Sequence, residues 1–221
     1  VPDQDKFDHL ASAPSEWPFL YRGMRMNGWG ADNYKYYLVG NPVIWWGSSL
    51  SLIVALPVLA WYIMRRQRRI HDMPPKVWDD FLFGLKIGWI GWVLQYFPFL
   101  MMGRVTYLHH YLPTLYFAVI VLVHLLDHYL WNDATARTSI DWPTLLRSGR
   151  IASTKLNPFV HDTAAAVPGR PLSQHFKNMS FAAVTGLVVG VFFWFCGVSF
   201  GMYGDISKWP YLKWRKNWDI Y

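Results

Sequence analysis

Four long apolar segments constrain this sequence more than any other feature. A helix needs about 20 mainly apolar residues to cross the hydrocarbon core of a bilayer, and the 221-residue chain contains four such stretches. Tryptophan and tyrosine crowd their ends, as the aromatic belts of membrane interfaces do. A soluble helix bundle has no need of four stretches of this length, so we predict an all-α, polytopic membrane protein. The predicted spans are residues 43–64, 81–102, 112–131 and 179–201.

The arginines predict which side of the membrane each span end faces. RRQRR, residues 65–69, directly follows the first span, and basic residues are enriched on the cytosolic side. In this topology the four-span region is 39–201, with a cytosolic loop at 132–177; residues 1–38 form a lumenal, interfacial lead-in and 202–221 a lumenal tail. Basic residues that flank spans also account for the net charge of +7 without a nucleic-acid partner.

The connection between the second and third spans, GRVTYLHHYLP at 103–113, is unusually polar for a hairpin tip. Arg104 just past a span is costly if it faces lipid, so it should face a cavity or an anionic partner, and its planar guanidinium suits phosphate. On a helix, the adjacent His109 and His110 diverge by about 100°, so that one could face the cavity while the other packs. Residue chemistry alone leaves two interpretations open, an anion-binding site or a belt of aromatic and basic residues that meets lipid headgroups.

The histidine pattern argues against a metal or haem centre. His110 and His124 have a spacing found in two-haem helices, but each haem needs a second axial ligand, and the other three spans contain no histidine. His124 and His128 alone are too few for a di-iron site, and we interpret them as a polar helix end with Asp127 paired to nearby basic residues. Cys196 is the single cysteine, which excludes an intrachain disulfide. We predict neither a metal nor a cofactor.

Three stretches resemble one family. FPFLMMGRVTYLHHYLPTLYF, residues 97–117, resembles a signature of the eukaryotic protein O-mannosyltransferases. WPFLYRGMRM followed by YYLVGNPVIWW is similar to that family's entry into its C-terminal membrane region, and SFGMYGDISKWPYLKWRKNWDIY is similar to its lumenal tail. The resemblance covers nearly the whole chain, although residues 132–177 form a longer connection than we expected.

The resemblance implies the last four spans of a larger GT-C type glycosyltransferase of the endoplasmic reticulum membrane. It implies transfer of mannose, with inversion, from dolichyl-phosphate mannose to serine or threonine of secretory proteins, and pairing with another protein O-mannosyltransferase subunit. An inverting transfer needs a carboxylate base, and in this family an acidic pair in the first lumenal loop fills that role. Because the chain begins at Val1 within the resembling region, we expect no catalytic residue in it and no activity from it alone.

Carried onto this sequence, the resemblance favours the anion site over the headgroup belt. The residues that it implies are Arg104, His109, His110 and Tyr111 at the donor lipid phosphate, with Asn41, Trp45 and Tyr107 as candidate lining of the cavity.

A second hypothesis belongs to another class, that of a non-catalytic membrane scaffold or assembly subunit. The fourth span carries small residues, which allow close packing of helices in membranes. These are Ala182, Ala183, Gly186 and Gly190.

Overall fold

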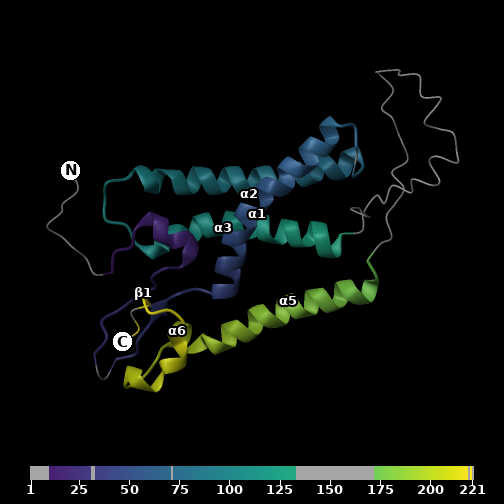
Figure 1. The fold of residues 1–221 in the computed structure, drawn as a ribbon. Coiled ribbons are helices and arrows are strands. Elements are labelled where there is room, and N and C mark those ends of the chain that lie inside the picture. Colours follow the sequence, from purple (N-terminus) through teal and green to yellow (C-terminus); the bar gives the residue numbers. More distant parts are fainter. Residues whose placement is uncertain (1–9, 31–32, 71, 133–171, 219, 221) are drawn as a thin grey trace, which may run out of the picture.

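The computed structural model of the chain describes residues 10–30, 33–70, 72–132, 172–218 and 220. Its frame consists of α1 (Pro42–Gln67), α2 (Pro75–Met101) and α3 (Leu112–Leu126), with α5 (Gln174–Trp194) at the edge of the bundle (Figure 1). The helix α1, the segment Leu108–Trp131 and α5 are long and apolar enough to cross a membrane. The second predicted span corresponds to α2, which has 27 residues but is not among these three, since Lys86 and several glycines and tryptophans lower its mean hydropathy.

The observed helices differ from the predicted spans mainly at their ends. The third predicted span is α3 followed by a π-helical turn, Asp127–Trp131. The fourth starts before its predicted position, because Ser173 Oγ accepts a hydrogen bond from Phe176 N at 3.2 Å and caps α5. This helix is interrupted at Phe195, after which α6 (Cys196–Phe200) follows. The predicted cytosolic loop therefore ends earlier than expected, and its residues 133–171 lie outside the described part of the chain.

Glycines on α2 allow α3 to approach closely. A Cβ atom added at Gly88 would lie 2.4 Å from Val121 Cγ2 and 3.3 Å from the carbonyl oxygen of Phe117. Added Cβ atoms at Gly84 and Gly91 would meet the rings of His124 and Phe117 at 2.5 and 2.3 Å. The α3 side chains thus occupy the space that side chains on α2 would otherwise fill, in the manner of small-residue interfaces between membrane helices.

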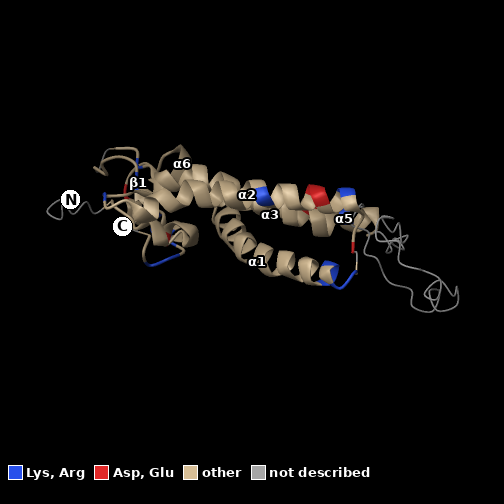
Figure 2. Ribbon diagram, turned by 90° about the horizontal axis from the view of Figure 1, so that it is seen from above, with Lys and Arg blue, Asp and Glu red and all other residues tan. Residues whose placement is uncertain are grey.

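Charged residues collect toward the two ends of the bundle (Figure 2). At one end, Arg65 closes the turn between α1 and α2 through a bidentate contact with Asp72, with Nε at 2.8 Å from Oδ2 and Nη2 at 2.6 Å from Oδ1. His128 Nε2 lies 3.0 Å from Tyr62 Oη, and His124 Nε2 lies 3.0 Å from the carbonyl oxygen of Phe81.

These histidines are therefore held by aromatic and backbone partners. Within the described part of the chain, Asp127 pairs with an amide and not with the expected basic residue, since its Oδ2 accepts a hydrogen bond from Asn132 Nδ2 at 3.4 Å. Among the residues with assigned positions, no group of three or more histidine, cysteine or acidic side chains could hold a metal ion.

The other end of the bundle contains the lead-in, the hairpin tip and the C-terminal tail (Figure 1). The lead-in forms a 3-10 helix, η1 (Pro14–Phe19), and a short antiparallel pair of strands, β1 (Met24–Arg25) and β2 (Tyr37–Leu38). The tail joins this pair through a bridge between Lys35 and Met202 and continues through two more 3-10 turns, η5 (Ile206–Lys208) and η6 (Pro210–Leu212). Because Trp17, Leu20 and Trp218 are fully buried here, lead-in and tail form one folded unit.

Candidate functional site

The hairpin tip separates into exposed and buried side chains. After α2 ends at Met101, residues 102–107 form a connection without regular structure, and a 3-10 turn, η2 (Leu108–Tyr111), leads directly into α3. Arg104 and His109 are exposed, whereas Thr106, Leu108 and Tyr111 are buried. Arg104 has no hydrogen-bond or ion-pair partner among the residues that the structure describes. A permanently charged, unpaired guanidinium at the end of a membrane hairpin is suited to bind an anion.

His109 and His110 stack on each other. Their ring centroids are 4.2 Å apart with an angle of 28° between the planes, so the predicted divergence of the two side chains is wrong. The reason is a local side-chain contact that holds the His110 ring back against its own segment, because its Nδ1 accepts a hydrogen bond from Tyr107 N at 3.1 Å. His109 is nevertheless the exposed member of the pair and His110 the half-buried one.

Tyr111 and Trp45 lie in an aromatic core below the tip. Both rings are almost completely inaccessible, with 0% and 1% of their surface exposed, and their centroids are 5.5 Å apart. Tyr111 Oη accepts a hydrogen bond from Trp92 Nε1 at 3.2 Å, and the Tyr96 ring packs edge-on against Tyr111. These positions give both residues a packing role beneath the exposed residues of the tip.

Asn41 also has a structural position. It precedes α1, and its Oδ1 accepts a hydrogen bond from Val43 N at 3.1 Å. Its Nδ2 donates to the carbonyl oxygen of Val188 in α5 at 2.9 Å. Both ends of the amide are therefore used within the chain. Arg104 and His109 are the predicted site residues that the structure leaves exposed, whereas Tyr107, His110 and Asn41 are half-buried.

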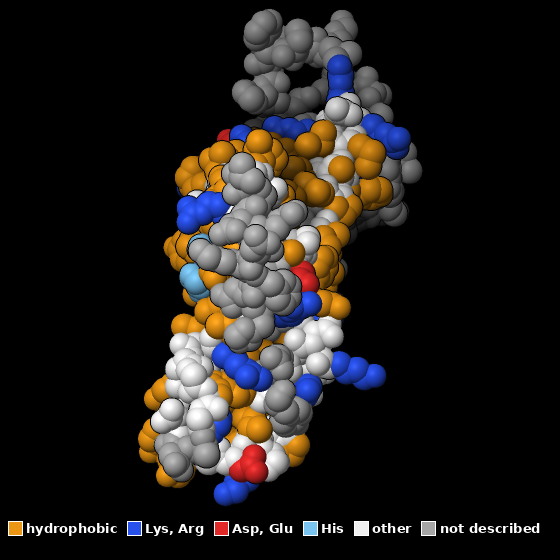
Figure 3. All heavy atoms as spheres, turned by 90° about the vertical axis from the view of Figure 1, so that its left-hand side faces the viewer, with side chains coloured by type: hydrophobic (Ala, Val, Ile, Leu, Met, Phe, Trp, Pro, Cys, Tyr) orange, Lys and Arg blue, Asp and Glu red, His pale blue; other side chains and the backbone are white. Residues whose placement is uncertain are grey.

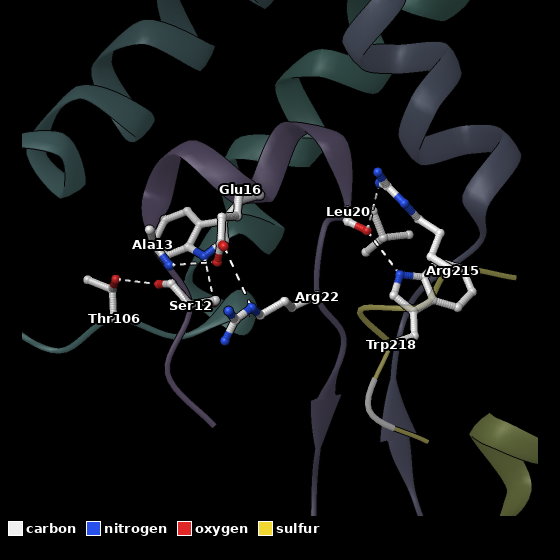
Figure 4. A network of polar contacts seen from close by, with 9 residues as sticks. Ser12, Ala13, Glu16, Leu20, Arg22, Thr106, Arg215 and Trp218 are labelled. Atoms are coloured by element: carbon white, nitrogen blue, oxygen red, sulfur yellow. Dashed lines mark hydrogen bonds and ion pairs between the residues drawn. The ribbon is translucent and has the colours of Figure 1, made fainter. Parts of the chain in front are cut away.

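Side-chain donors fix the backbone of the lead-in next to the tip. Trp45 Nε1 donates to the carbonyl oxygen of Trp17 at 2.6 Å, and Trp218 Nε1 donates to that of Leu20 at 3.0 Å. Arg215 Nη1 donates to the carbonyl oxygen of Phe19 at 2.8 Å, and Figure 4 shows how Arg215 and Trp218 reach the lead-in from the tail. Buried carbonyl groups need such partners, so η1 is held between α1 and the tail.

A shallow hollow of about 640 Å³ lies beside the lead-in. It is bordered by the exposed rings of Phe19, Tyr21 and Trp46, and also by Glu16 and Arg215. Neither Arg104 nor His109 lines it. Figure 3 looks onto this end of the molecule, where hydrophobic and basic side chains are mixed and acidic ones are few.

Two contacts to the tip could not be predicted from the sequence. In the lead-in, Ser12 accepts a hydrogen bond from Thr106. Trp17, also in the lead-in, stacks on His110. Trp17 opens the WPFLYRGMRM stretch, but both contacts join positions far apart in the sequence, so no local pattern could have revealed them.

Comparison with known proteins identifies the chain. A family model described as the C-terminal four TMM region of protein-O-mannosyltransferase matches residues 2–218. The chain belongs to the protein O-mannosyltransferase family. The predicted family is thereby confirmed, together with the all-α membrane fold.

Curated members of the family match most or all of the chain. The sequence is 33% identical to dolichyl-phosphate-mannose–protein mannosyltransferase 2 of Candida albicans and 32% identical to mannosyltransferase 6 of Saccharomyces cerevisiae, in both cases over 100% of this chain. It is 30% identical to mouse protein O-mannosyl-transferase 1 over 80% of the chain. The chain spans about a quarter of the length of these protein O-mannosyltransferases, namely 25%, 24% and 24%.

A solved structure has a similar fold. It is described as the structure of the S. cerevisiae protein O-mannosyltransferase Pmt1-Pmt2 complex bound to the sugar donor. The TM-score is 0.66 at 21% sequence identity, and the match covers 97% of this chain and 24% of the other. At this identity the likeness bears on the arrangement of the helices.

Proposed function

We propose that the complete protein transfers mannose from dolichyl-phosphate mannose to serine or threonine of other proteins, and that this chain supplies the surface that binds the donor phosphate. Membership of the protein O-mannosyltransferase family and the names of the full-length relatives support the reaction. The observation that carries the assignment of the site is the exposed Arg104, which has no hydrogen-bond or ion-pair partner among the described residues, in the same hairpin tip as the exposed His109.

The proposed roles follow from accessibility. Arg104 contacts the phosphate of the donor and stabilises the negative charge that develops on dolichyl phosphate as the bond to mannose breaks, as preorganised cations do for leaving groups. His109 donates a further hydrogen bond to the same phosphate. His110 and Tyr107 hold His109 in place through ring stacking, at 4.2 and 5.7 Å between centroids. Tyr111, Trp45 and Asn41 support the tip from below.

The base of the reaction is assigned to the rest of the polypeptide. An inverting transfer needs a carboxylate that accepts the proton of the acceptor hydroxyl. Within the described part of the lead-in, Glu16 is the one acidic residue. Its Oε2 accepts a hydrogen bond from Ala13 N at 3.1 Å, and its Oε1 lies 3.6 Å from Arg22 Nε. We therefore propose that Glu16 is structural, and that the acidic pair implied by the family resemblance acts from outside this chain.

The proposed location is the membrane of the endoplasmic reticulum, with the tip, lead-in and tail on the lumenal side. Acceptor proteins in the secretory pathway and the lipid donor would both reach the tip from that side. The proposed partner is a second protein O-mannosyltransferase subunit, because the structure with the similar fold is a complex of two such proteins.

Replacement of Arg104 tests the site. In the full-length enzyme with its partner, Arg104→Ala should lower transfer by about a hundredfold, the usual cost of removing one stabiliser of developing charge. Arg104→Lys keeps the charge but not the planar fork and should retain intermediate activity. The matched control is Arg68→Ala, which removes an exposed arginine at the opposite end of the bundle. Unchanged transfer in Arg104→Ala, at normal protein levels, would exclude the phosphate role.

The assembly hypothesis has an observation of its own. Only 6% of the apolar window of α5 is buried within the chain, and Cβ atoms added at Gly186 or Gly190 would meet nothing within 4 Å. We propose that this face packs against another helix of the assembled enzyme. A cysteine introduced by Gly190→Cys, with Cys196→Ser, should crosslink to protein; labelling by lipid-phase reagents alone would contradict it.

A further inference from the structure

Ser12 joins the lead-in to the hairpin tip through its backbone N–H and carbonyl groups, while its side chain bonds within the lead-in. Its backbone N donates to the carbonyl oxygen of Thr106 at 2.9 Å, and its own carbonyl oxygen accepts from Thr106 Oγ1 at 2.8 Å. Ser12 Oγ accepts from Trp17 Nε1 at 2.8 Å. Ser12 and Thr106 are 7% and 5% exposed, so water does not replace these bonds easily. Figure 4 shows the bond between the two segments.

A row of stacked rings forms a second connection between the same segments. The Trp17 ring packs against His110 with 6.3 Å between centroids and 23° between planes. His110 in turn stacks on His109 at 4.2 Å and 28°. Trp17 is fully buried, whereas His109 is exposed. The orientation of the exposed His109 ring is thus set by a buried residue, Trp17, through the His110 ring between them.

Both connections end on the residues that present the donor site. Thr106 is two positions from Arg104, and His110 is adjacent to His109. No helix or strand spans residues 102–107, so this connection lacks the internal hydrogen bonds that would hold it on its own. Its position depends on contacts such as the reciprocal bonds to Ser12.

We infer that Ser12, Thr106 and Trp17 are positioning residues for the donor phosphate, which rests on the function proposed above. The role that we propose for them is indirect, because they contact neither Arg104 nor the donor. They hold the connection and the imidazole of His109 at the place where the phosphate binds. The lead-in therefore belongs to the donor site in addition to linking the membrane region to the chain before it.

Thr106→Val tests the inference with a small change. Valine has nearly the shape of threonine but cannot donate to the carbonyl oxygen of Ser12. In the full-length enzyme, the KM for dolichyl-phosphate mannose should rise about fivefold, the order of magnitude expected for one hydrogen bond, while kcat changes less. Thr106→Ser retains the hydroxyl and should restore the KM.

Thr114→Val is the matched control. Thr114 is also buried, in α3, but its Oγ1 has no hydrogen-bond partner within the described part of the chain. The same substitution there should leave the donor KM unchanged. Hydrogen exchange gives an independent readout, because Thr106→Val should speed exchange of the amides of residues 103–107 and Thr114→Val should not.

The outcomes separate this inference from the proposed function. If Arg104→Ala weakens donor binding but Thr106→Val leaves both the donor KM and the exchange unchanged, the positioning role is overturned and the donor site stands. If Arg104→Ala also leaves donor binding unchanged, both proposals fail. A raised donor KM in Thr106→Val that Thr106→Ser reverses supports the inference.

Discussion

The side chain of Asn41 joins the start of α1 to the middle of α5, since its Nδ2 donates to the carbonyl oxygen of Val188 at 2.9 Å. The same side chain caps α1 through its Oδ1, which accepts from Val43 N at 3.1 Å. Closer to the start of α5, Trp131 Nε1 donates to Ser180 Oγ at 3.1 Å. One amide therefore both begins a membrane helix and positions another.

Replacement of Asn41 should destabilise the chain through both roles. Asn41→Ala removes the cap and the tether, and we expect a loss of about 1–2 kcal/mol in the free energy of unfolding. Asn41→Asp keeps an acceptor for the cap but loses the donor to Val188, so its loss should be smaller. Thermal unfolding of the purified protein in detergent measures the stability of both variants. The control is Asn178→Ala, at an exposed position. Equal stability of Asn41→Ala and wild type would contradict the double role.

Gly88 sets the distance between α2 and α3. In Gly88→Ala the new Cβ would lie 2.4 Å from Val121 Cγ2, so the helices must separate, and we expect a loss of about 1–3 kcal/mol. Gly186→Ala is the comparison, because its Cβ meets nothing within 4 Å in this chain and alanine favours a helix. The midpoint of thermal unfolding should fall in the first variant and not in the second.

In the assembled enzyme, we expect Gly186→Ala to have a different effect from its effect on the chain alone. If α5 packs closely against another helix there, the added methyl group should weaken that assembly although the chain itself tolerates it. Size-exclusion chromatography of the full-length complex measures this. An intact complex in Gly186→Leu would show that this face of α5 is not a protein interface.

Asp72 should stabilise the turn between α1 and α2. It is the acceptor in a bidentate contact with Arg65, and such pairs are stronger than single surface ion pairs. The side chains are 29% and 19% exposed for Arg65 and Asp72, so we expect Asp72→Ala to lose only about 1 kcal/mol of stability. Limited proteolysis near residue 70 should become faster, and the exposed Asp79→Ala should not change it.

The order of the tail should depend on pH through Asp205. Its Oδ1 accepts a hydrogen bond from Ser207 N at 3.0 Å, and the hydrogen bonds to Ser207 lower the pKa of this carboxyl from its ordinary value of 3.8. Because the pKa of Asp205 is lower in the folded state, its ionised carboxylate stabilises the folded tail at pH values above the ordinary pKa. This stabilisation is lost as the pH falls through the lowered pKa. The protection of the Ser207 amide, which is its exchange rate compared with that of an unfolded chain at the same pH, should therefore fall in acid, and Asp205→Asn should remove that dependence.

Much of the membrane architecture could be predicted from the sequence, because long apolar runs and their aromatic ends are local signals. The same holds for the hairpin tip, whose polar residues stand out between two spans. The family resemblance also rests on local motifs, and the comparisons confirm it. The ends of the helices were harder to place, since a cap such as Ser173 or a break such as Phe195 depends on a single side chain.

The sequence by itself determined which residues gather at the tip, and that Arg104 is a cation beside a membrane span. Only the tertiary structure decided which of them remain accessible. Tyr111 and Trp45 are drawn into an aromatic core, His110 is held over Trp17, and Arg104 and His109 stay at the surface. The physical reason is that exposure depends on the lead-in, which packs against the tip from a distant part of the chain, and no periodicity within the tip carries information about that contact.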